Sequence, residues 1–281
     1  MTKRDDFSVD IPDVLIPYKL GDLGGHPDYQ AAKAGDTAAA IKLASELVTD
    51  DVAEKIAHIG GNDTLLLPVL AEELAGRNKI PLAIAKVLQG KTGRKVELSV
   101  YQVNKPTRTG LGGLDRIFAV PEFEGEGDLS GKLFLLVDDT LTQGGTFASL
   151  AAHIRQNGGR VAGAMALTGK QFSARLRLDT STLDKLRQQH GDIENDFREA
   201  TGYGFGALTE SEARYLANYK PSQAVRDRIL EERDAAISRS NGQDTGSIKK
   251  PPPPGWVETT LGAVVDYGST IKVESTVIED S

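Results

Sequence analysis

The sequence of 281 residues contains no cysteine. This absence excludes a disulfide framework, a thiolate metal site and a cysteine nucleophile, and it fits a reducing compartment. No run of apolar residues approaches the roughly 18 that a membrane-spanning helix requires. The N-terminal stretch “MTKRDDFSVDIPDVLIPYKL” also lacks the long apolar core of a signal peptide. We therefore expect a cytoplasmic protein with no membrane partner.

An excess of positive charge is also lacking, because the formal net charge is −7. Surfaces that bind nucleic-acid backbones are usually basic, so we expect no nucleic-acid partner. Apolar residues make up 39% of the chain and charged residues 26%, which is ordinary for a globular protein. The length allows one large domain with appendages.

A continuous apolar run at residues 132–139, “KLFLLVDD”, is typical of a strand that is covered on both faces. The following residues predict a helix over 145–159 and a second strand over 160–169. A strand, a helix and a strand joined by short turns indicate parallel pairing with right-handed crossovers. The sequence therefore predicts an α/β fold, a parallel twisted sheet flanked by helices, with added helical regions at both ends.

The remaining elements are predicted from shorter patterns. Strands are expected at 54–61, 80–89, 95–104 and 116–120, and helices at 26–51, with a break at Gly35–Thr37, at 62–78 and across 171–238. Thr209 and Glu212 have the spacing of a capping box. We predict four regions: an N-terminal segment (1–51), a core (52–170), a helical region (171–240) and a proline-rich linker with a tail (241–281).

Asp138 and Asp139 are adjacent carboxylates at the carboxyl end of the predicted buried strand, where open α/β sheets bind ligands. Two such charges repel each other and lose hydration, so a sugar diol or a hydrated divalent cation must compensate them. The turn that follows, Thr142–Thr146, leads into a helix N-terminus whose free N–H groups suit a phosphate. Together these features describe a site for ribose 5-phosphate.

The stretch “LFLLVDDTLTQGGT” resembles the signature of the type I phosphoribosyltransferases, which bind 5-phosphoribosyl-1-pyrophosphate. The resemblance implies the fold of that family and implies that Asp138 and Asp139 hold the ribose 2′- and 3′-hydroxyls. The 5-phosphate would then be wrapped by the loop residues Thr142, Gln143, Gly144, Gly145 and Thr146. It also implies Mg²⁺ as a cofactor, bound through the substrate near the two aspartates, and makes a homodimer an expectation.

Other segments resemble the family with lower specificity. Gly60 and Gly61 would present N–H groups to the pyrophosphate, or they form a plain tight turn. Lys86 would direct its charge at the pyrophosphate, or it is simply solvated. Residues 104–131 occupy the place of the mobile catalytic loop, in which Lys105, Arg108 and Arg116 would close over the pyrophosphate.

Thr142 departs from the 6-oxopurine members, which carry an aspartate at this position, and so argues against a hypoxanthine or guanine acceptor. The acceptor would be bound by a variable hood, for which residues 1–51 and 171–238 are the candidates. Tyr203 and Phe205 would stack on the base or, alternatively, anchor a loop on the core. The acceptor itself is not predicted.

The tail “PPGWVETTLGAVVDYGSTI” resembles the opening of a target-recognition domain in type I restriction specificity subunits. Three functions are therefore considered. The first is a phosphoribosyltransferase that transfers the phosphoribosyl group to a nitrogenous base with release of pyrophosphate. The second is a non-catalytic regulator that binds a phosphoribosyl ligand or nucleotide, and the third is a partner-binding subunit of a restriction or defence system.

Overall fold

In a computed structural model of the chain, the described residues are Arg4, 11–70, 78–103, 112–125, 127–220 and 222–242. The chain divides into two compact units, Met1–Arg239 and Ser240–Ser281. The elements from β1 to α9 all belong to the first unit.

The first unit contains a four-stranded sheet in the order β1-β6-β5-β2. Its strands are β1 (Tyr18–Lys19), β2 (Leu65–Pro68), β5 (Leu133–Leu141) and β6 (Arg160–Gly169). All three neighbouring pairs are parallel, so the carboxyl ends of the strands meet at one edge. The predicted α/β fold with a parallel sheet is therefore confirmed, as are the predicted strands at β5 and β6.

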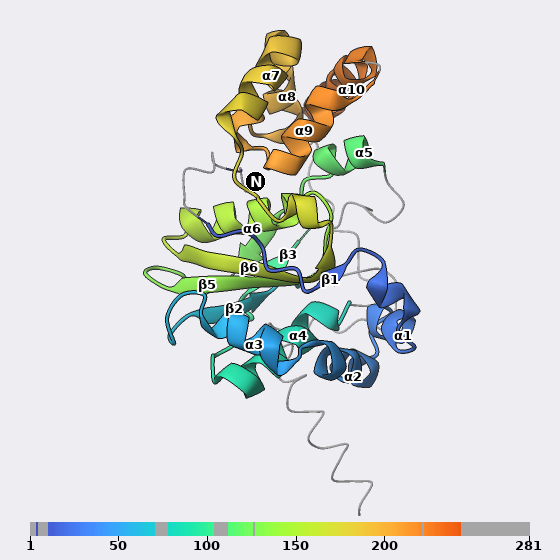
Figure 1. Cartoon of the computed structure of the whole chain (residues 1–281). Coiled ribbons are helices and arrows are strands. Elements are labelled where there is room, and N and C mark those ends of the chain that lie inside the picture. The colour runs from blue at the N-terminus through green and yellow to red at the C-terminus, as the bar shows by residue number, and fades with distance from the viewer. Residues whose placement is uncertain are drawn as a thin grey trace, which may run out of the picture. The chain divides into compact units, whose positions relative to one another are not determined.

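Helices cover both faces of this sheet. The helices are α1 (Tyr29–Lys33), α2 (Thr37–Leu47), α3 (Asp50–Ala57), α4 (Ile80–Thr92), α5 (Gly113–Phe118), α6 (Gly145–Gln156), α7 (Thr180–His190), α8 (Glu194–Thr201), α9 (Glu210–Asn218) and α10 (Ser222–Gly242). Helix α6 lies on one side of the sheet and α2, α3 and α4 lie on the other (Figure 1). Short 3₁₀ helices are η1 (Asp22–Gly25), η2 (Gln171–Ser173), η3 (Gly191–Ile193) and η4 (Phe205–Ala207).

The alternation of side chains along β5 explains the two layers, because successive residues of a strand point to opposite faces. Phe134 and Leu136 pack in the cluster that contains α6, whereas Leu135 and Val137 pack in the cluster that contains α2, α3 and α4. All four side chains are almost completely buried. A strand with two covered faces must be apolar throughout, which is why the run carries no polar residue before Asp138.

A third apolar cluster joins α5 to the helical region. It is centred on Phe197, whose ring lies 5.0 Å from that of Phe205 and 5.7 Å from that of Tyr203. Helices α7, α8 and α9 gather beyond α6, on the side away from α2–α4 (Figure 1). A separate antiparallel pair is formed by β3 (Val100–Gln102) and β4 (Phe123–Gly125).

Four predicted elements are wrong. Residues 80–89 form the first part of helix α4, not a strand, and residues 54–57 close helix α3. The strand expected at 116–120 is instead the second half of α5. Of the predicted helix over 62–78, residues 65–68 form strand β2 instead, and residues 71–77 lie outside the described residues.

The local signals at helix starts are confirmed. The Asp36 side chain accepts a hydrogen bond from the N–H of Ala39 and caps α2 after the predicted break. Thr209 and Glu212 form the capping box of α9. The strand expected at 95–104 is present only as a bridge at Val96 and the short β3. The four predicted region boundaries stay predictions.

Candidate functional site

The carboxyl edge of the sheet carries the polar residues from which the candidate site is built. Asp138 and Asp139 lie in the second half of β5, opposite the second half of β6, with Asp138 in register with Ala166. Pro68 at the end of β2 lies opposite Val137, and the N–H of Val69 donates to the Val137 carbonyl. The chain that leaves β1 enters η1 at the same edge, because Lys19 pairs with Gly169.

The two aspartates have different surroundings. Asp138 Oδ1 accepts a hydrogen bond of 2.8 Å from the N–H of Asp139. Asp139 is 7% exposed, and its Oδ2 accepts from the side-chain amide of Asn78 at 2.9 Å. Burial and the neighbouring Asp139 carboxylate raise the pKa of Asp138 well above its ordinary value. A hydrogen-bond donor or a cation near Asp138 would therefore favour its charged form.

Lys33, at the end of α1, supplies part of that compensation. Its Nζ donates to the Tyr29 hydroxyl at 3.1 Å and lies 5.4 Å from the centroid of the Tyr29 ring. Burial lowers the pKa of Lys33, but the charges of Asp139 and Asp138 and the Tyr29 hydroxyl outweigh it, so the pKa is raised. Lys33 therefore stays protonated beside the aspartates.

The loop after β5 leads into the N-terminus of α6, as predicted. Gly144 caps the helix with a φ of 86°, a left-handed conformation that favours glycine. The first backbone hydrogen bond of the helix runs from the N–H of Ala148 to the carbonyl of Gly144. The N–H groups at the start of the helix point out of its end, where the helix dipole favours an anion.

The loop backbone is held from outside the sheet by α9. Thr209 Oγ1 donates to the Gln143 carbonyl at 2.6 Å, and the same hydroxyl accepts from the N–H of Glu212 at 3.1 Å. Glu212 Oε2 in turn accepts from the N–H of Thr209 at 3.0 Å. The capping box of α9 therefore also fixes the position of the loop.

Arg4 completes this network from the other end of the chain. Its guanidinium donates to Glu212 Oε2 at 2.7 Å, to Ser149 Oγ at 3.0 Å and to the Gly145 carbonyl at 3.1 Å. It also lies over the Tyr203 ring, with 4.5 Å between Cζ and the ring centroid. Both Arg4 and Glu212 are buried, so their charges neutralise each other inside the protein.

These contacts give a different explanation of why the loop has glycine at positions 144 and 145. A Cβ on Gly145 would lie 2.4 Å from Glu212 Oε1 and 2.6 Å from Arg4 Nη2, and one on Gly144 would lie 2.4 Å from Leu176 Cδ2. The sequence suggested that the glycines admit a ligand close to the backbone. In the structure they first of all admit the side chains that brace the loop.

A cavity of about 460 Å³ opens at this edge, within the size range of small-molecule sites. It joins the predicted loop to one of the aspartates and to residues that the sequence did not single out. The lining includes Asp138, Thr140, all five residues of 142–146, Lys33, Tyr29, Arg116, Glu212 and the start of η1. The structure thus brings Asp138 and the loop to one space, while Asp139 lies behind it against Asn78.

The predicted pyrophosphate residues lie elsewhere. A Cβ on Gly60 would touch Leu133 and Ala162, at the amino ends of β5 and β6, so the turn at Gly60 and Gly61 lies at the opposite edge from Asp138. The sequence had placed this glycine pair after a strand, whereas it precedes β2. Lys86 is exposed on α4 and donates to Gln89, so its predicted direction toward a pyrophosphate is also wrong.

Of the predicted catalytic loop, Lys105 and Arg108 lie outside the described residues, and Arg116 on α5 lines the cavity. Tyr203 and Phe205 are buried in the third apolar cluster, at 3% and 0% exposure. They anchor the helical region, as the alternative interpretation held, and do not stack on a base. Lys33, Asn78, Arg4 and Glu212 were missed, because nothing in their local sequence links them to β5.

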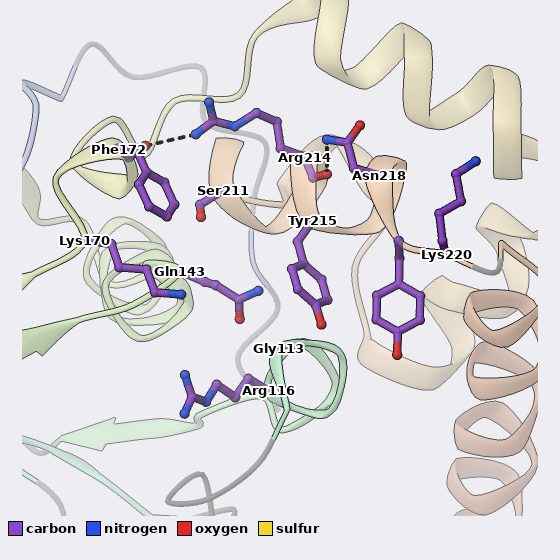
Figure 2. A pocket seen from close by; sticks show the side chains of 11 residues that line it. Gly113, Arg116, Gln143, Lys170, Phe172, Ser211, Arg214, Tyr215, Asn218 and Lys220 are labelled. Carbon is purple, nitrogen blue, oxygen red and sulfur yellow. Dashed lines mark hydrogen bonds between the residues drawn. The ribbon is translucent and has the colours of Figure 1, made fainter. Parts of the chain in front are cut away.

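A second cavity, of about 550 Å³, adjoins the first and shares Gln143 and Arg116 with it. It lies among α5, η2, α9 and the loop, and Figure 2 shows the side chains of Gln143 and Tyr215 pointing toward the same space. No helix in the part of the chain that the structure describes has both the length and the apolar character to cross a bilayer.

No family model matches the sequence. Protein TraN of Escherichia coli is 40% identical over 243 residues, which cover 86% of this chain and 54% of that protein. An uncharacterized protein of Haemophilus influenzae is 45% identical over 152 residues, which cover 54% of this chain and 34% of that protein. The chain thus spans about half the length, or less, of these curated relatives.

Among solved structures, a purine phosphoribosyltransferase from Pyrococcus horikoshii Ot3 matches 50% of this chain and 89% of its own. The two chains are 14% identical, and the TM-score is 0.31.

Proposed function

We propose that the chain binds 5-phosphoribosyl-1-pyrophosphate with Mg²⁺ at the carboxyl edge of its sheet. The phosphoribosyl group would pass to a nitrogenous base or related acceptor with release of pyrophosphate, as in the type I phosphoribosyltransferases. The observation that carries the proposal is the 460 Å³ cavity, in which Asp138 and the loop 142–146 line one space. A ribose 5-phosphate has hydroxyls at one end and a phosphate at the other. Its two ends match a cavity that has a carboxylate in one part of its lining and a helix N-terminus in another.

The loop supplies the phosphate end of the proposed site. Gly145, Thr146 and Phe147 begin α6, at the end of the helix where the dipole is positive and favours an anion. Thr142 and Thr146 add hydroxyl donors in the lining. Because Thr209 and Arg4 hold the carbonyls of Gln143 and Gly145, the loop is preorganised for the anion.

Asp138 supplies the ribose end. Its carboxylate would accept a ribose hydroxyl, and this hydrogen bond favours the charged form that burial opposes. Asp139 is held by Asn78. It would either contact the ribose next to Asp138 or act on the ribose only through Asp138. Lys33 carries a positive charge at the same end, where the pyrophosphate on C1 would depart with the electron pair of its C–O bond.

The acidic pair also fits a cation, because a nearby positive charge lowers the cost of two buried carboxylates. Asp138 and Asp139 would hold Mg²⁺ through water or the ribose hydroxyls, and the ion would supply charge to the leaving pyrophosphate. The residues of the chain position the ribose and the phosphate so that the acceptor nitrogen meets C1 in line.

One observation favours a non-catalytic regulator that binds the same ligand. Gly60, Gly61 and Lys86, which the sequence assigned to the pyrophosphate, lie away from the cavity. A protein that keeps the ribose 5-phosphate half of the site without the pyrophosphate half would bind a nucleotide and not turn it over. Turnover therefore separates the two functions, and binding alone does not.

Calorimetry with 5-phosphoribosyl-1-pyrophosphate and Mg²⁺ tests binding, and a screen of bases for pyrophosphate release tests turnover. We expect one site, weakened at least about tenfold by Asp138→Asn and by Thr146→Val, each of which removes one strong contact. Lys55→Ala, on the exposed part of α3, should bind like the wild type. Binding without release of pyrophosphate on any base would favour the regulator, and no binding at millimolar ligand would refute both.

A further inference from the structure

The second cavity has a chemistry of its own. Its lining includes four cationic side chains, from Arg116, Lys170, Arg214 and Lys220, and no acidic one among the described residues. The whole chain carries a net charge of −7, so the charge of this lining is opposite in sign to that of the molecule, and one of its cations, Arg214, also pairs with Glu210, with 3.5 Å between Nε and Oε1. Clustered cations around a concave space attract an anion.

Aromatic rings lie among these cations. Phe172 is 64% exposed, which is unusual for so large an apolar side chain. Lys170 Nζ lies 5.8 Å and Arg214 Cζ 6.0 Å from the centroid of its ring. The rings of Tyr215 and Tyr219 lie 5.5 Å apart at an interplanar angle of 52°. An exposed ring flanked by cations provides a face on which another flat ring stacks.

Hydrogen-bonding groups complete the lining. Gln143, Ser211 and Asn218 contribute an amide, a hydroxyl and a second amide to the lining, and Figure 2 shows the side chains of Gln143 and Ser211 on the same side of α9. Asn218 Nδ2 donates to the Arg214 carbonyl and its Oδ1 accepts from Lys185 Nζ at 2.6 Å, so both ends of this amide are fixed by the protein. Ser211 shares a hydrogen bond with Ser173 at 2.9 Å. These groups can orient a polar ring that the aromatics hold.

The position of the cavity distinguishes its ligand from an acceptor base. Among the described residues, the lining shares Gln143 and Arg116 with the first cavity but includes neither Asp138 nor Lys33. It therefore adjoins the phosphate loop and not the carboxylates. A base that accepts the phosphoribosyl group must reach C1 of the ribose. In the proposed site, C1 lies at the hydroxyl end of the ligand, on the side of Asp138. The two cavities thus hold different molecules.

We propose that the second cavity binds a nucleoside monophosphate, with its base against Phe172 or Tyr215 and its phosphate among the four cations. The volume of about 550 Å³ suits a ligand of this size. The base of such a ligand suits the aromatic rings of the lining, and its phosphate suits the cations. This inference does not depend on the function proposed for the first cavity.

Calorimetry with 2′,3′-dideoxyadenosine 5′-monophosphate tests the proposal, because this probe has a base and a phosphate for the second cavity but lacks the ribose hydroxyls that Asp138 would bind in the first. We expect saturable binding that Phe172→Ala weakens roughly tenfold, the effect of losing one stacking partner. Lys170→Ala combined with Lys220→Ala should weaken it by a similar factor or more. Adenosine and inorganic phosphate, each offering half of the chemistry, should bind more weakly than the probe.

A matched variant provides the control. Lys55→Ala should leave binding of the probe unchanged, since Lys55 does not line the second cavity. The proposal is overturned if the probe does not bind at millimolar concentration, or if Phe172→Ala binds it as tightly as the wild type does. Much tighter binding of a single-stranded oligodeoxynucleotide, with a steep salt dependence, would also overturn it and identify a nucleic acid as the occupant.

Discussion

Arg4 and Glu212, 208 residues apart in the sequence, form a buried ion pair with 2.7 Å between Nη1 and Oε2. The side chain of Arg4 is 0% exposed and that of Glu212 is 2% exposed. Burial lowers the pKa of Arg4, but the Glu212 charge and hydrogen bond outweigh it, so the pKa is raised. The pair links Arg4 near the N-terminus, the start of α6 and α9 through one charged contact.

Glu212→Gln should destabilise the protein by about 3–5 kcal/mol, because it leaves the Arg4 charge buried without a partner. Urea denaturation measures the free energy of unfolding. The matched control is Asp192→Asn, which breaks an ion pair to Arg226 whose carboxylate is exposed and should change stability little. Equal losses in the two variants would contradict the account given for Arg4 and Glu212.

Asp138→Asn should stabilise the protein at neutral pH. The pKa of Asp138 in the folded state is raised above its ordinary value of 3.8, so the protonated form is favoured by folding. The contribution of Asp138 to the stability of the wild type is thus fully present below pH 3.8. This contribution is lost as the pH rises toward the raised pKa.

The asparagine variant lacks this titration. Its free energy of unfolding should equal that of the wild type, apart from a constant offset, at acidic pH and should exceed it increasingly as the pH rises. Urea titrations at a series of pH values measure the difference between the two proteins. A difference that does not change with pH would show that Asp138 titrates normally in the folded state.

Gly145→Ala should destabilise the protein by roughly 1–3 kcal/mol, because its Cβ would collide with Glu212 and Arg4. Gly61→Ala is the control, since a Cβ there meets nothing within 4 Å. Gly61→Ala should also leave binding of 5-phosphoribosyl-1-pyrophosphate unchanged, because the turn lies at the other edge of the sheet. Thermal unfolding and calorimetry of both variants measure these effects, and weaker ligand binding by Gly61→Ala would reinstate the original assignment.

Lys33→Met should weaken binding of 5-phosphoribosyl-1-pyrophosphate roughly tenfold, the effect of losing one charge-assisted contact. The methionine keeps most of the apolar stem against Tyr29 and removes the charge beside Asp138 and Asp139. Lys42→Met is the control, because Lys42 pairs with Asp28 at an exposed position. Calorimetry should show normal affinity for the control, and similar affinities of both variants would exclude Lys33 from the site.

The strand with the aspartates was predictable because its signal is local. Residues 133–137 are apolar on both faces, and the turn and helix that follow have their own signatures. The same signature is present at β2, where Leu66 and Leu67 are fully buried, but the run is short and ends in Pro68. It was therefore assigned to a helix, and the glycine pair before it was placed after a strand.

Helix α4 was mistaken for a strand for a related reason. The residues from Ile80 to Leu88 are apolar at most positions because the helix packs deep in the second cluster, and Pro81 occupies the first turn, where a helix tolerates it. Periodicity is weak when several sides of an element are covered. The contacts of Arg4 and Asn78, and the place of Lys33 near Asp138 and Asp139, were not predictable, because each depends on residues more than sixty positions away.

The Thr209 hydroxyl sets a lower limit on any fragment of this protein that retains the shape of the loop 142–146. A fragment that stops at Gly169, the natural place to cut after the last strand, would keep every residue of this loop but lose the donor to the Gln143 carbonyl. It would also lose Leu176 and Glu212, against which Gly144 and Gly145 pack. We therefore expect the loop to lose its conformation in a fragment that contains the sheet alone. The smallest fragment suitable for structural work should include α9.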